Sequence, residues 1–514
     1  MQKLILLCLL VFAVTSCEDF LDEVPRDSVS PANFYNNDGD ALAAVNGAYA
    51  ALQSTGYYSR YWINASVHAS DGAFSRVASD RGAINNLNDA GMLSSNRYNE
   101  QTWAATWQAV NRANSVLGNV PGIEMDEDLK ARILAEATFV RALTYFNMVR
   151  RWGALPIILE ETNTSSLLEL QVSREPVAAV YSQIYTDLME AIAVLPYKSE
   201  YDESDTGRAS KEAAQGLLAK AYLYQRDFQN AKEYALDVIE DSPSELALLP
   251  EHSDLWEQDA ADNSVESLFE VQYNGQPQGH SIGNNYEPRN SGYGPGQWGT
   301  IHARLYFFNT FDDDDKRKAS TFLTEIPDIT TGETVNWWEN ITVLAPHIDK
   351  YRSPDTRIDD GMGYNLKVLR YANVLLVAAE AINEVDGPEA AAPYVNQVRE
   401  RAGLPALDGL STEEMRDAIW NEYRMELAYE GEDYEELVRQ GKLIENMIAS
   451  TDYEIPPLVE SNGDVTPLTP ELEDAIRRWQ PTIEIMEADP WNVLFPLPQT
   501  AVDKNPNLLQ NDGY

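Results

Sequence analysis

Two segments far apart in the chain carry the residue pattern of a helix–turn–helix repeat, and this pattern limits the fold more than any other feature. In the first segment, apolar, small, aromatic and proline residues recur at the spacing of a helix pair: Leu218, Ala219, Tyr222, Ala231 and Pro243. The second segment, Leu369 to Leu404, places Ala379 and Ala391 at the same separation as Ala219 and Ala231. Because small residues let two helices approach closely, each segment predicts a packed helix pair of the tetratricopeptide type.

Helical spacing of apolar residues extends through the first part of the chain. Trp103, Trp107 and Val110 recur every three or four residues, as in a buried helical stripe, and the stripe continues through Ala113 and Leu117. Two more helices are expected, one over Glu136 to Arg151 and one from Pro176 to Leu195. The only good strand candidate is Leu268 to Tyr273. We therefore predict an all-α fold, a scaffold of tetratricopeptide-like helix pairs.

Two long excursions interrupt these helices, over residues 52–100 and 245–360. Long connections in compact domains usually carry function. The second excursion is rich in Gly, Pro, Asn and aromatic residues, and it includes Tyr293, Trp298, Trp337 and Trp338. Exposed rings of this kind stack on sugars, while neighbouring amides and carboxylates meet sugar hydroxyls. The alternative for any single ring is a buried support that holds an irregular loop in place.

The net charge of the chain limits the classes of partner that we expect it to bind. The chain has 38 Lys and Arg against 82 Asp and Glu, a net charge of −44. Such a surface repels phosphate backbones and anionic lipid headgroups, so nucleic acid is excluded as an expected partner. No segment after the N-terminal apolar run is apolar enough to span a membrane.

Several short motifs match enzyme signatures without the context that those signatures need. Ser281 lies in a Gly-x-Ser-x-Gly pattern that lacks the strand before it and the helix after it. The run Gly294 to Gly299 matches a dinucleotide fingerprint without a βα unit; a loop before a helix over Arg304 to Phe311 explains it better. The four aspartates from Asp312 to Asp315 are read as a helix end or turn rather than a calcium loop.

No cofactor or metal is expected, because the five histidines are scattered without paired spacing. A glycosidase needs two carboxylates at a defined separation, and among so many acidic residues the sequence singles out no pair.

Cys17 lies at the end of a secretory signal. Lys3 precedes an apolar run from Leu4 to Val14, about 11 residues against the roughly 20 that a membrane span needs. Thr15 and Ser16 then lead into the cysteine, as in a lipoprotein signal. We expect residues 1–16 to be removed, Cys17 to be lipidated, and residues 17–514 to form one domain. The alternative is an ordinary signal peptide with an incidental cysteine. Cys8 leaves with the signal, so the mature chain has no disulfide.

The chain as a whole resembles the SusD/RagB family of surface nutrient-binding lipoproteins of Bacteroidetes. The resemblance consists of short motifs that follow one another in order: Cys17 to Asp22 with Pro25, Trp107 with Ala113 and Asn114, Ala135 to Ala142 leading into Tyr145 and Phe146, Gly153 with Pro156, Gly207 to Lys211, Leu369 to Ala372, Ala379 to Ala381, Val398 to Leu404, and Asn505 to Tyr514. The segment Asn421 to Asp433 departs from the family pattern, since Tyr423 and Asp433 stand where arginines are usual. We expect these two changes to affect helix packing rather than binding.

The resemblance implies a non-catalytic protein on the outer face of the outer membrane, held there by the lipid on Cys17. The acidic residues after Cys17 resemble the export signal of such lipoproteins. Family members resemble lids over a TonB-dependent transporter of the SusC type, which capture glycan and pass it on. Peptide capture, as in RagB-type members, is one alternative, and a surface glycosidase is another.

The family's ligand residues follow no fixed signature, so the site is predicted from the chain itself. Trp298, Tyr293, Trp337 and Trp338 are the expected stacking rings, with Arg81 as a group that reads hydroxyls and Tyr98 as a further ring.

Overall fold

The structure is a computed structural model that describes the greater part of the chain. The described residues are 34–75, 93–162, 171–257, 261–275, 279–288, 298–327, 332–337, 344–351, 361–451, 453–459, 465–479 and 493–514.

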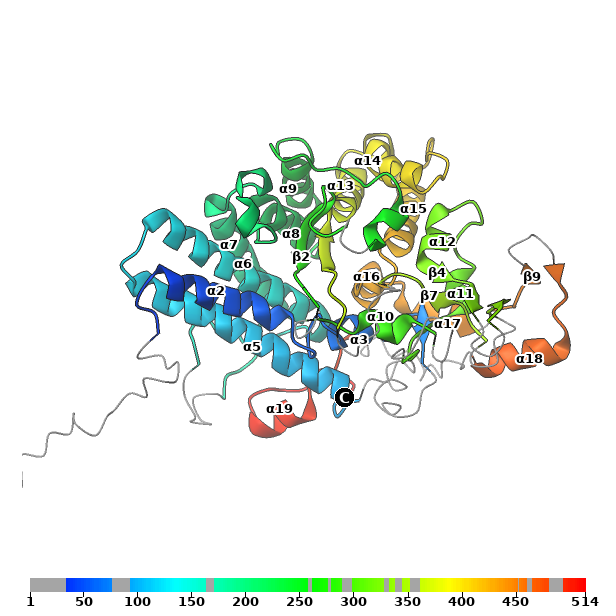
Figure 1. The fold of residues 1–514 in the computed structure, drawn as a ribbon, viewed down its shortest axis with the longest axis horizontal. Coiled ribbons are helices and arrows are strands. Elements are labelled where there is room, and N and C mark those ends of the chain that lie inside the picture. The colour runs from blue at the N-terminus through cyan, green and yellow to red at the C-terminus, as the bar shows by residue number, and fades with distance from the viewer. Residues whose placement is uncertain are drawn as a thin grey trace, which may run out of the picture.

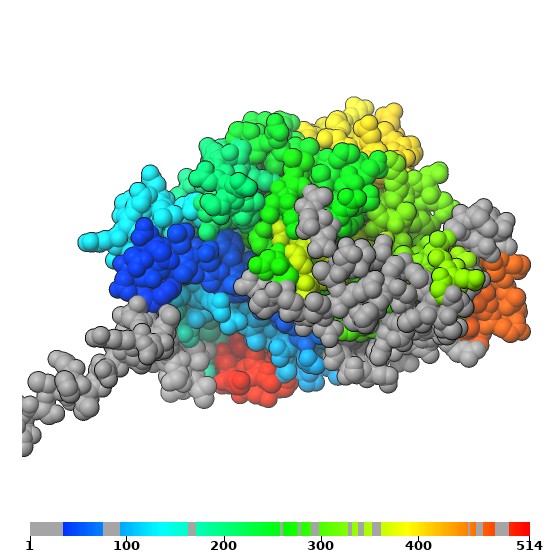
Figure 2. Space-filling view, in the orientation of Figure 1, coloured from blue at the N-terminus to red at the C-terminus, as the bar shows by residue number. Residues whose placement is uncertain are grey.

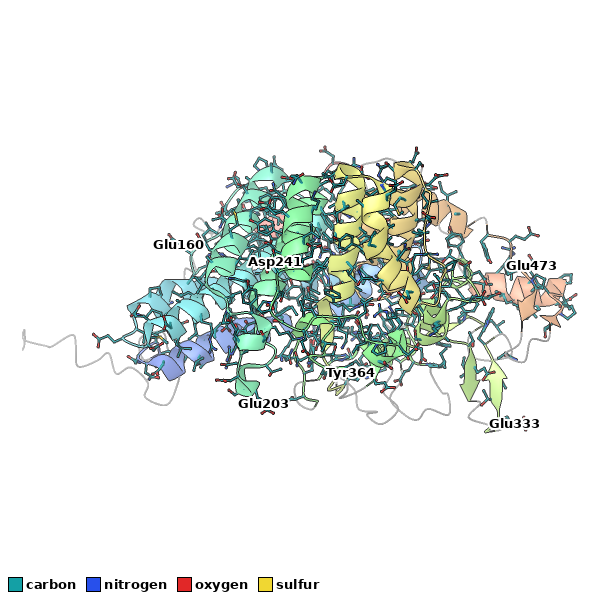
Figure 3. All side chains as sticks on the ribbon, turned by 90° about the horizontal axis from the view of Figure 1, so that it is seen from above. Glu160, Glu203, Asp241, Glu333, Tyr364 and Glu473 are labelled. Carbon is teal, nitrogen blue, oxygen red and sulfur yellow. The ribbon has the colours of Figure 1, made fainter. Side chains whose placement is uncertain are left out.

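Long helices stand side by side and form the body of the molecule (Figures 1 and 3). In chain order they are α2 (Asp38–Leu52), α5 (Arg97–Asn119), α6 (Glu127–Trp152), α7 (Val177–Val194), α8 (Lys211–Tyr224), α9 (Phe228–Ile239), α13 (Tyr371–Val385), α14 (Pro388–Arg401) and α15 (Thr412–Glu426). Consecutive members pack on each other, and α9 packs directly on α13. The two predicted helix pairs, α8 with α9 and α13 with α14, are therefore neighbours in space. The prediction of an all-α, tetratricopeptide-like scaffold is confirmed.

Local chemistry explains where these helices begin and end. The side chain of Asn96 accepts hydrogen bonds from the backbone N–H groups of Tyr98 and Asn99 at the start of α5. Asp126 caps α6 in the same way, through Leu129 N. Gly153 ends α6 with a φ of 75°, a conformation that favours glycine. These signals are local, so the sequence placed α5 and α7 within two turns of their observed bounds. Helix α6 begins at Glu127, nine residues before its predicted start at Glu136.

The excursions contain short elements. The first holds α3 (Tyr61–Ala69), which the sequence analysis did not predict. In the described part of the second, no helix exceeds six residues: α10 (Ile282–Tyr286), α11 (Leu305–Phe308) and α12 (Lys316–Thr321). A 3-10 turn also lies in the second excursion, at His252–Trp256, and further ones connect the long helices, at Val120–Gly122, Lys198–Glu200 and Glu203–Asp205. The helix expected over Arg304 to Phe311 is thus limited to α11, because Asn309 already leaves the helical conformation.

The described strands form five separate two-stranded antiparallel pairs: β1 (Ala73–Phe74) with β3 (His302–Ala303), β2 (Ser267–Val271) with β8 (Leu366–Arg370), β4 (Phe322–Leu323) with β7 (His347–Ile348), β5 (Glu325–Pro327) with β6 (Thr334–Asn336), and β9 (Leu458–Val459) with β10 (Val465–Thr466). The strand predicted from Leu268 is β2. It pairs Val271 with Leu366 and Ser267 with Arg370, and β8 then runs directly into α13. This ribbon fastens both ends of the second excursion to the helices.

The C-terminal part adds α16 (Asp433–Gln440), α17 (Leu443–Thr451), α18 (Pro470–Trp479) and α19 (Gln499–Lys504). In Figure 2, α18 (orange) and α2 (dark blue) lie at opposite ends of the molecule, and α19 (red) lies beside α5 (light blue). Gln499 N donates to Ser94 O at 2.9 Å and holds α19 in that place. Among the described helices, none combines the length and apolar character that crossing a bilayer requires.

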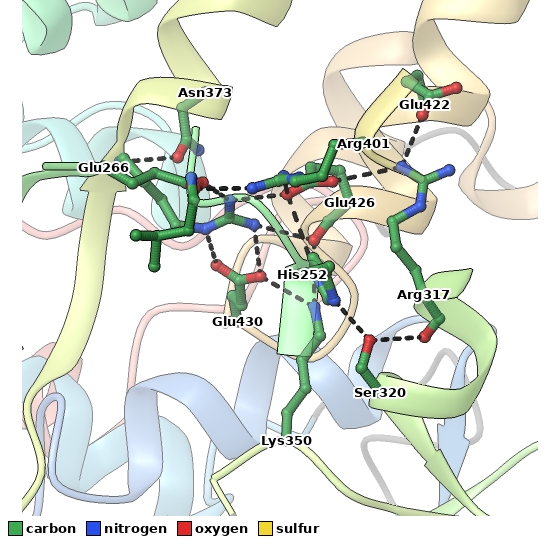
Figure 4. A network of polar contacts seen from close by, with 12 residues as sticks. His252, Glu266, Arg317, Ser320, Lys350, Asn373, Arg401, Glu422, Glu426 and Glu430 are labelled. Carbon is green, nitrogen blue, oxygen red and sulfur yellow. Dashed lines mark hydrogen bonds and ion pairs between the residues drawn. The ribbon is translucent and has the colours of Figure 1, made fainter. Parts of the chain in front are cut away.

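One cluster of buried apolar side chains extends from Ala48 to Leu508 and joins the helices to the excursions. Buried ion pairs cross the same region. Figure 4 shows Glu266, Glu426 and Glu430 converging, with Arg401 and Lys350 beside them. Arg401 Nη1 lies 2.7 Å from Glu266, and Lys350 Nζ lies 2.9 Å from Glu430. The excursion is thus fixed to the helical scaffold by charge as well as by apolar packing.

Candidate ligand-binding site

A stacked aromatic and cationic cluster lies where the two excursions meet. The guanidinium carbon of Arg60 is 4.5 Å from the ring centroid of Trp298, a distance typical of a cation–π contact. Arg60 precedes α3 in the first excursion, and Trp298 belongs to the second. Both side chains are half-buried, so they are packed on the protein and still reach the surface.

Tyr61 continues this cluster toward α5. Its ring centroid lies 5.3 Å from the guanidinium carbon of Arg60 and 5.6 Å from that of Arg97. Arg97 Nη2 also donates to the Tyr61 hydroxyl at 2.6 Å. Arg97 is exposed, whereas the Tyr61 ring is buried. The cluster therefore presents two guanidinium groups that are oriented by one buried ring.

A buried ion pair fixes the position of α3, and with it the positions of Arg60 and Tyr61. Arg151 of α6 lies with its guanidinium carbon 3.5 Å from the ring centroid of Trp62, and its Nε donates to Glu435 at 2.9 Å. The Ser66 hydroxyl donates to the other oxygen of Glu435 at 2.6 Å. Since Trp62 and Ser66 both belong to α3, this contact ties the short helix to α6 and α16.

Trp298 is positioned by α10. Its backbone N–H donates to Asn284 O at 2.8 Å. The Thr300 hydroxyl donates to Asn285 Oδ1 at 2.7 Å. At the other side of α10, Ser281 N donates to Ser59 O at 3.3 Å, next to Arg60. The backbone of α10 thus connects the two residues of the stack.

Close packing holds α10 itself. A Cβ added at Gly283 would lie 2.2 Å from Tyr351 O, so only glycine fits at this point. Burial raises the pKa of Tyr286 well above its ordinary value, and the neutral hydroxyl donates to Tyr429 O at 3.2 Å. The residues that carry Trp298 are therefore closely packed.

The structure brings together only some of the predicted site residues. Trp298 belongs to the cluster. Tyr98 lies behind it, with its ring centroid 4.5 Å from that of Tyr61, but it is 0% exposed. A ring without exposed surface cannot stack on a ligand, so the assignment of Tyr98 as a contact residue is corrected to a supporting role.

Trp337 is corrected in the same way. It is 2% exposed and packs in a separate apolar cluster with Leu305, Ile326 and Leu458. The second excursion folds over this ring, which makes it a core residue. Tyr293, Trp338, Arg81 and Cys17 lie outside the described residues.

Sequence reasoning missed Arg60, Tyr61 and Arg97. One signal was available, because an arginine directly precedes a tyrosine at both Arg60 and Arg97. No local pattern indicates that these two pairs contact one another at the start of α5.

The Gly-x-Ser-x-Gly motif around Ser281 is built into the interior. Ser281 and His280 are both 0% exposed, and His280 Nδ1 accepts from Ile282 N at 3.2 Å. Burial lowers the pKa of His280 to about 3. Asp315 caps α12 and pairs with Arg317 at 2.8 Å, as expected of a helix end. No group of three metal-ligating side chains occurs within the described ranges.

The fold and the site define a class of protein: a helical-repeat scaffold whose inserted loops bring a half-buried tryptophan, Trp298, and the arginines Arg60 and Arg97 to the surface. Comparison with known proteins gives the family. Residues 330–514 match the model of the SusD family, and residues 19–223 match a model described as "Starch-binding associating with outer membrane". The SusD-like protein P2 of Formosa agariphila is 30% identical over 98% of both chains.

Solved structures agree on the fold. A SusD homologue from Bacteroides thetaiotaomicron superposes with a TM-score of 0.79 at 22% identity, covering 94% of this chain and 98% of its own. Surface glycan-binding protein A of the same organism, solved in complex with laminarihexaose, has a TM-score of 0.72 at 20% identity and covers 93% and 100%. The chain belongs to the SusD/RagB family.

Proposed function

We propose that this protein is a cell-surface glycan-binding lipoprotein. It captures an oligosaccharide or polysaccharide and passes it to a TonB-dependent transporter of the SusC type, and it performs no catalysis itself. Lipidated Cys17 anchors residues 17–514, which form one domain, to the outer face of the outer membrane. The observation that carries the proposal is the stack of Arg60 on Trp298 at the meeting point of the two excursions.

The chemistry of this cluster suits a sugar. An indole ring offers a flat apolar face to the C–H side of a pyranose, and guanidinium groups donate to pairs of hydroxyls. Arg60 and Arg97 are spaced by the ring of Tyr61, so their donors are held in fixed positions. The bound laminarihexaose in the similar Bacteroides thetaiotaomicron protein supports glycan as the ligand class.

Calorimetric titration of the purified mature protein tests this proposal. The panel contains laminarihexaose, oligosaccharides of other linkages, and peptides of mixed sequence. We expect a saturable heat with at least one oligosaccharide and no new product on chromatography after prolonged incubation. Release of shorter sugars would show a glycosidase, and binding of peptides alone would show a RagB-type peptide receptor; either result would contradict the proposal.

A further inference from the structure

A cavity of about 350 Å³ lies between α5, residues 156–162, Val172 and the C-terminal segment. Three cavities elsewhere among the described residues measure only 10 to 20 Å³, room for about one water molecule. The large cavity falls in the size range of small-molecule sites. Trp107 and Ile158 in its wall are half-buried, so it opens to the surface. It is separate from the Arg60 and Trp298 cluster, with which it shares no residue.

The walls of this cavity are mainly apolar, formed by Trp103, Trp107, Val110, Ile158, Val172 and Leu508. The side-chain amides of two asparagines in the wall are already hydrogen-bonded to protein groups around them. Asn114 Nδ2 donates to Ile158 O at 2.9 Å, and its Oδ1 accepts from Arg141 at 3.1 Å. Asn505 Nδ2 donates to Val172 O at 2.8 Å, and its Oδ1 accepts from Asn507 N. These amides hold the cavity open rather than face a ligand.

Asn111 provides the remaining donor. Its Oδ1 accepts from Thr162 N at 2.7 Å, and its Nδ2 has no hydrogen-bond partner among the described residues. Thr162, also in the wall, adds a hydroxyl. A pyranose would bring several hydroxyls into this space, more than these two groups of the described wall can satisfy, and burying an unpaired hydroxyl is unfavourable. An apolar molecule with one hydrogen-bond acceptor fits the same cavity without burying an unpaired hydroxyl.

We propose that this cavity is a second binding site, which takes a small neutral molecule with an aromatic or aliphatic body and one carbonyl acceptor. The two indoles and the aliphatic wall hold the body, and Asn111 Nδ2 donates to the carbonyl. The net charge of −44 disfavours an anionic ligand. The site does not depend on glycan binding, so either proposal stands or fails without the other.

Prodan, a neutral naphthalene with one ketone, is a suitable probe because its emission shifts to the blue in apolar surroundings. We expect saturable binding to the full mature chain, with energy transfer from tryptophan. Ile158→Trp fills the cavity and should weaken binding at least tenfold. Leu159→Trp adds the same ring at the next residue, which is 40% exposed, and should bind prodan as the wild type does.

Asn111→Leu removes the donor and should weaken prodan binding at least threefold, while circular dichroism shows that the variant remains folded. If Ile158→Trp does not fold, Val172→Trp fills the cavity from the opposite wall, and the same loss of prodan binding is expected of it. Absence of saturable binding to the wild type, or equal binding by the wild type and the filled variant, would overturn the site. Unchanged affinity in Asn111→Leu would overturn the carbonyl chemistry.

Discussion

Arg370 forms a two-point ion pair with Glu430, its Nε and Nη2 each lying 2.8 Å from a carboxylate oxygen. Both side chains are buried, and Arg370 Nη1 also contacts Glu266 and Glu426 at 2.7 Å. Arg370 ends β8 and Glu266 immediately precedes β2, while Glu426 ends α15 and Glu430 follows that helix. One guanidinium thus joins the second excursion to the scaffold that carries the candidate site.

Replacing Arg370 should therefore destabilise the fold strongly. Arg370→Met leaves buried carboxylates with fewer cations, and breaking a buried pair lowers the free energy of unfolding by about 3–5 kcal/mol. Lys442→Met is the control, since Lys442 pairs with Glu445 on the surface and such pairs contribute about 0–1 kcal/mol. Urea unfolding measures both variants. Equal losses would show that the buried cluster does not hold the excursion.

The ionisation of Asp433 should make the free energy of unfolding depend on pH. Burial raises the pKa of Asp433 to about 7, although its Oδ1 accepts a hydrogen bond from Tyr429 N at 3.0 Å. Between pH 4 and 7 the folded chain keeps a proton that the unfolded chain has lost, so this group makes the protein less stable as the pH rises. The difference approaches roughly 4 kcal/mol at 1.36 kcal/mol per pKa unit.

Asp433→Asn keeps the acceptor for Tyr429 N and removes the titration. We expect the variant to match the wild type near pH 4 and to exceed it in free energy of unfolding by a growing margin up to pH 7. Urea titrations at several pH values would check this. A constant difference between the two proteins across that range would contradict the raised pKa.

Much of the scaffold could be predicted because its signals are local. Apolar spacing, Pro176 before α7 and the small residues Ala379 and Ala391 each act within one helix or helix pair. The contact of α9 with α13 joins segments more than a hundred residues apart, and no local pattern encodes it. The expectation that Tyr423 and Asp433 affect packing fits the burial of Tyr423 and the half-buried position of Asp433.

The site was predicted less completely for a physical reason. Aromatic residues in a loop show that apolar area must be covered, but not whether protein or ligand covers it. Trp298 and Trp337 looked alike in the sequence; one is half-buried beside Arg60, and the other is enclosed by Leu305 and Ile326. The positions of Arg60 and Arg97 in the site depend on the path of both excursions through space. No local sequence pattern encodes that path.

Trp337 and Trp298 should accordingly respond in opposite ways to substitution. Trp337→Ala empties a core position and should lower the free energy of unfolding by about 3–5 kcal/mol. Its ring does not face the candidate site, so glycan affinity should stay at the wild-type value wherever the variant is folded. Chemical unfolding and calorimetry measure the two quantities. A folded Trp337→Ala protein that has lost glycan affinity would show that the ring does serve the ligand.

We expect the ion pair between Arg151 and Glu435, which packs against α3, to affect glycan binding indirectly. Glu435→Gln removes the charge that faces Arg151 and keeps an acceptor for the Ser66 hydroxyl. We expect lower stability and a severalfold loss of glycan affinity, because Arg60 and Tyr61 begin the helix that this pair holds. Calorimetry beside a thermal melt would follow both. Full glycan affinity in a destabilised variant would separate α3 from the site.

Calorimetry of Trp298→Ala with the oligosaccharide that binds the wild-type protein tests the central claim most directly. Trp420→Ala is the matched control, because Trp420 is also a half-buried tryptophan but lies on α15 and donates to Glu380. We predict that Trp298→Ala remains folded and loses affinity at least about tenfold, which corresponds to roughly 1.4 kcal/mol, while Trp420→Ala binds as the wild type does. Wild-type affinity in a folded Trp298→Ala protein would contradict the assignment of glycan binding to the Arg60 and Trp298 stack.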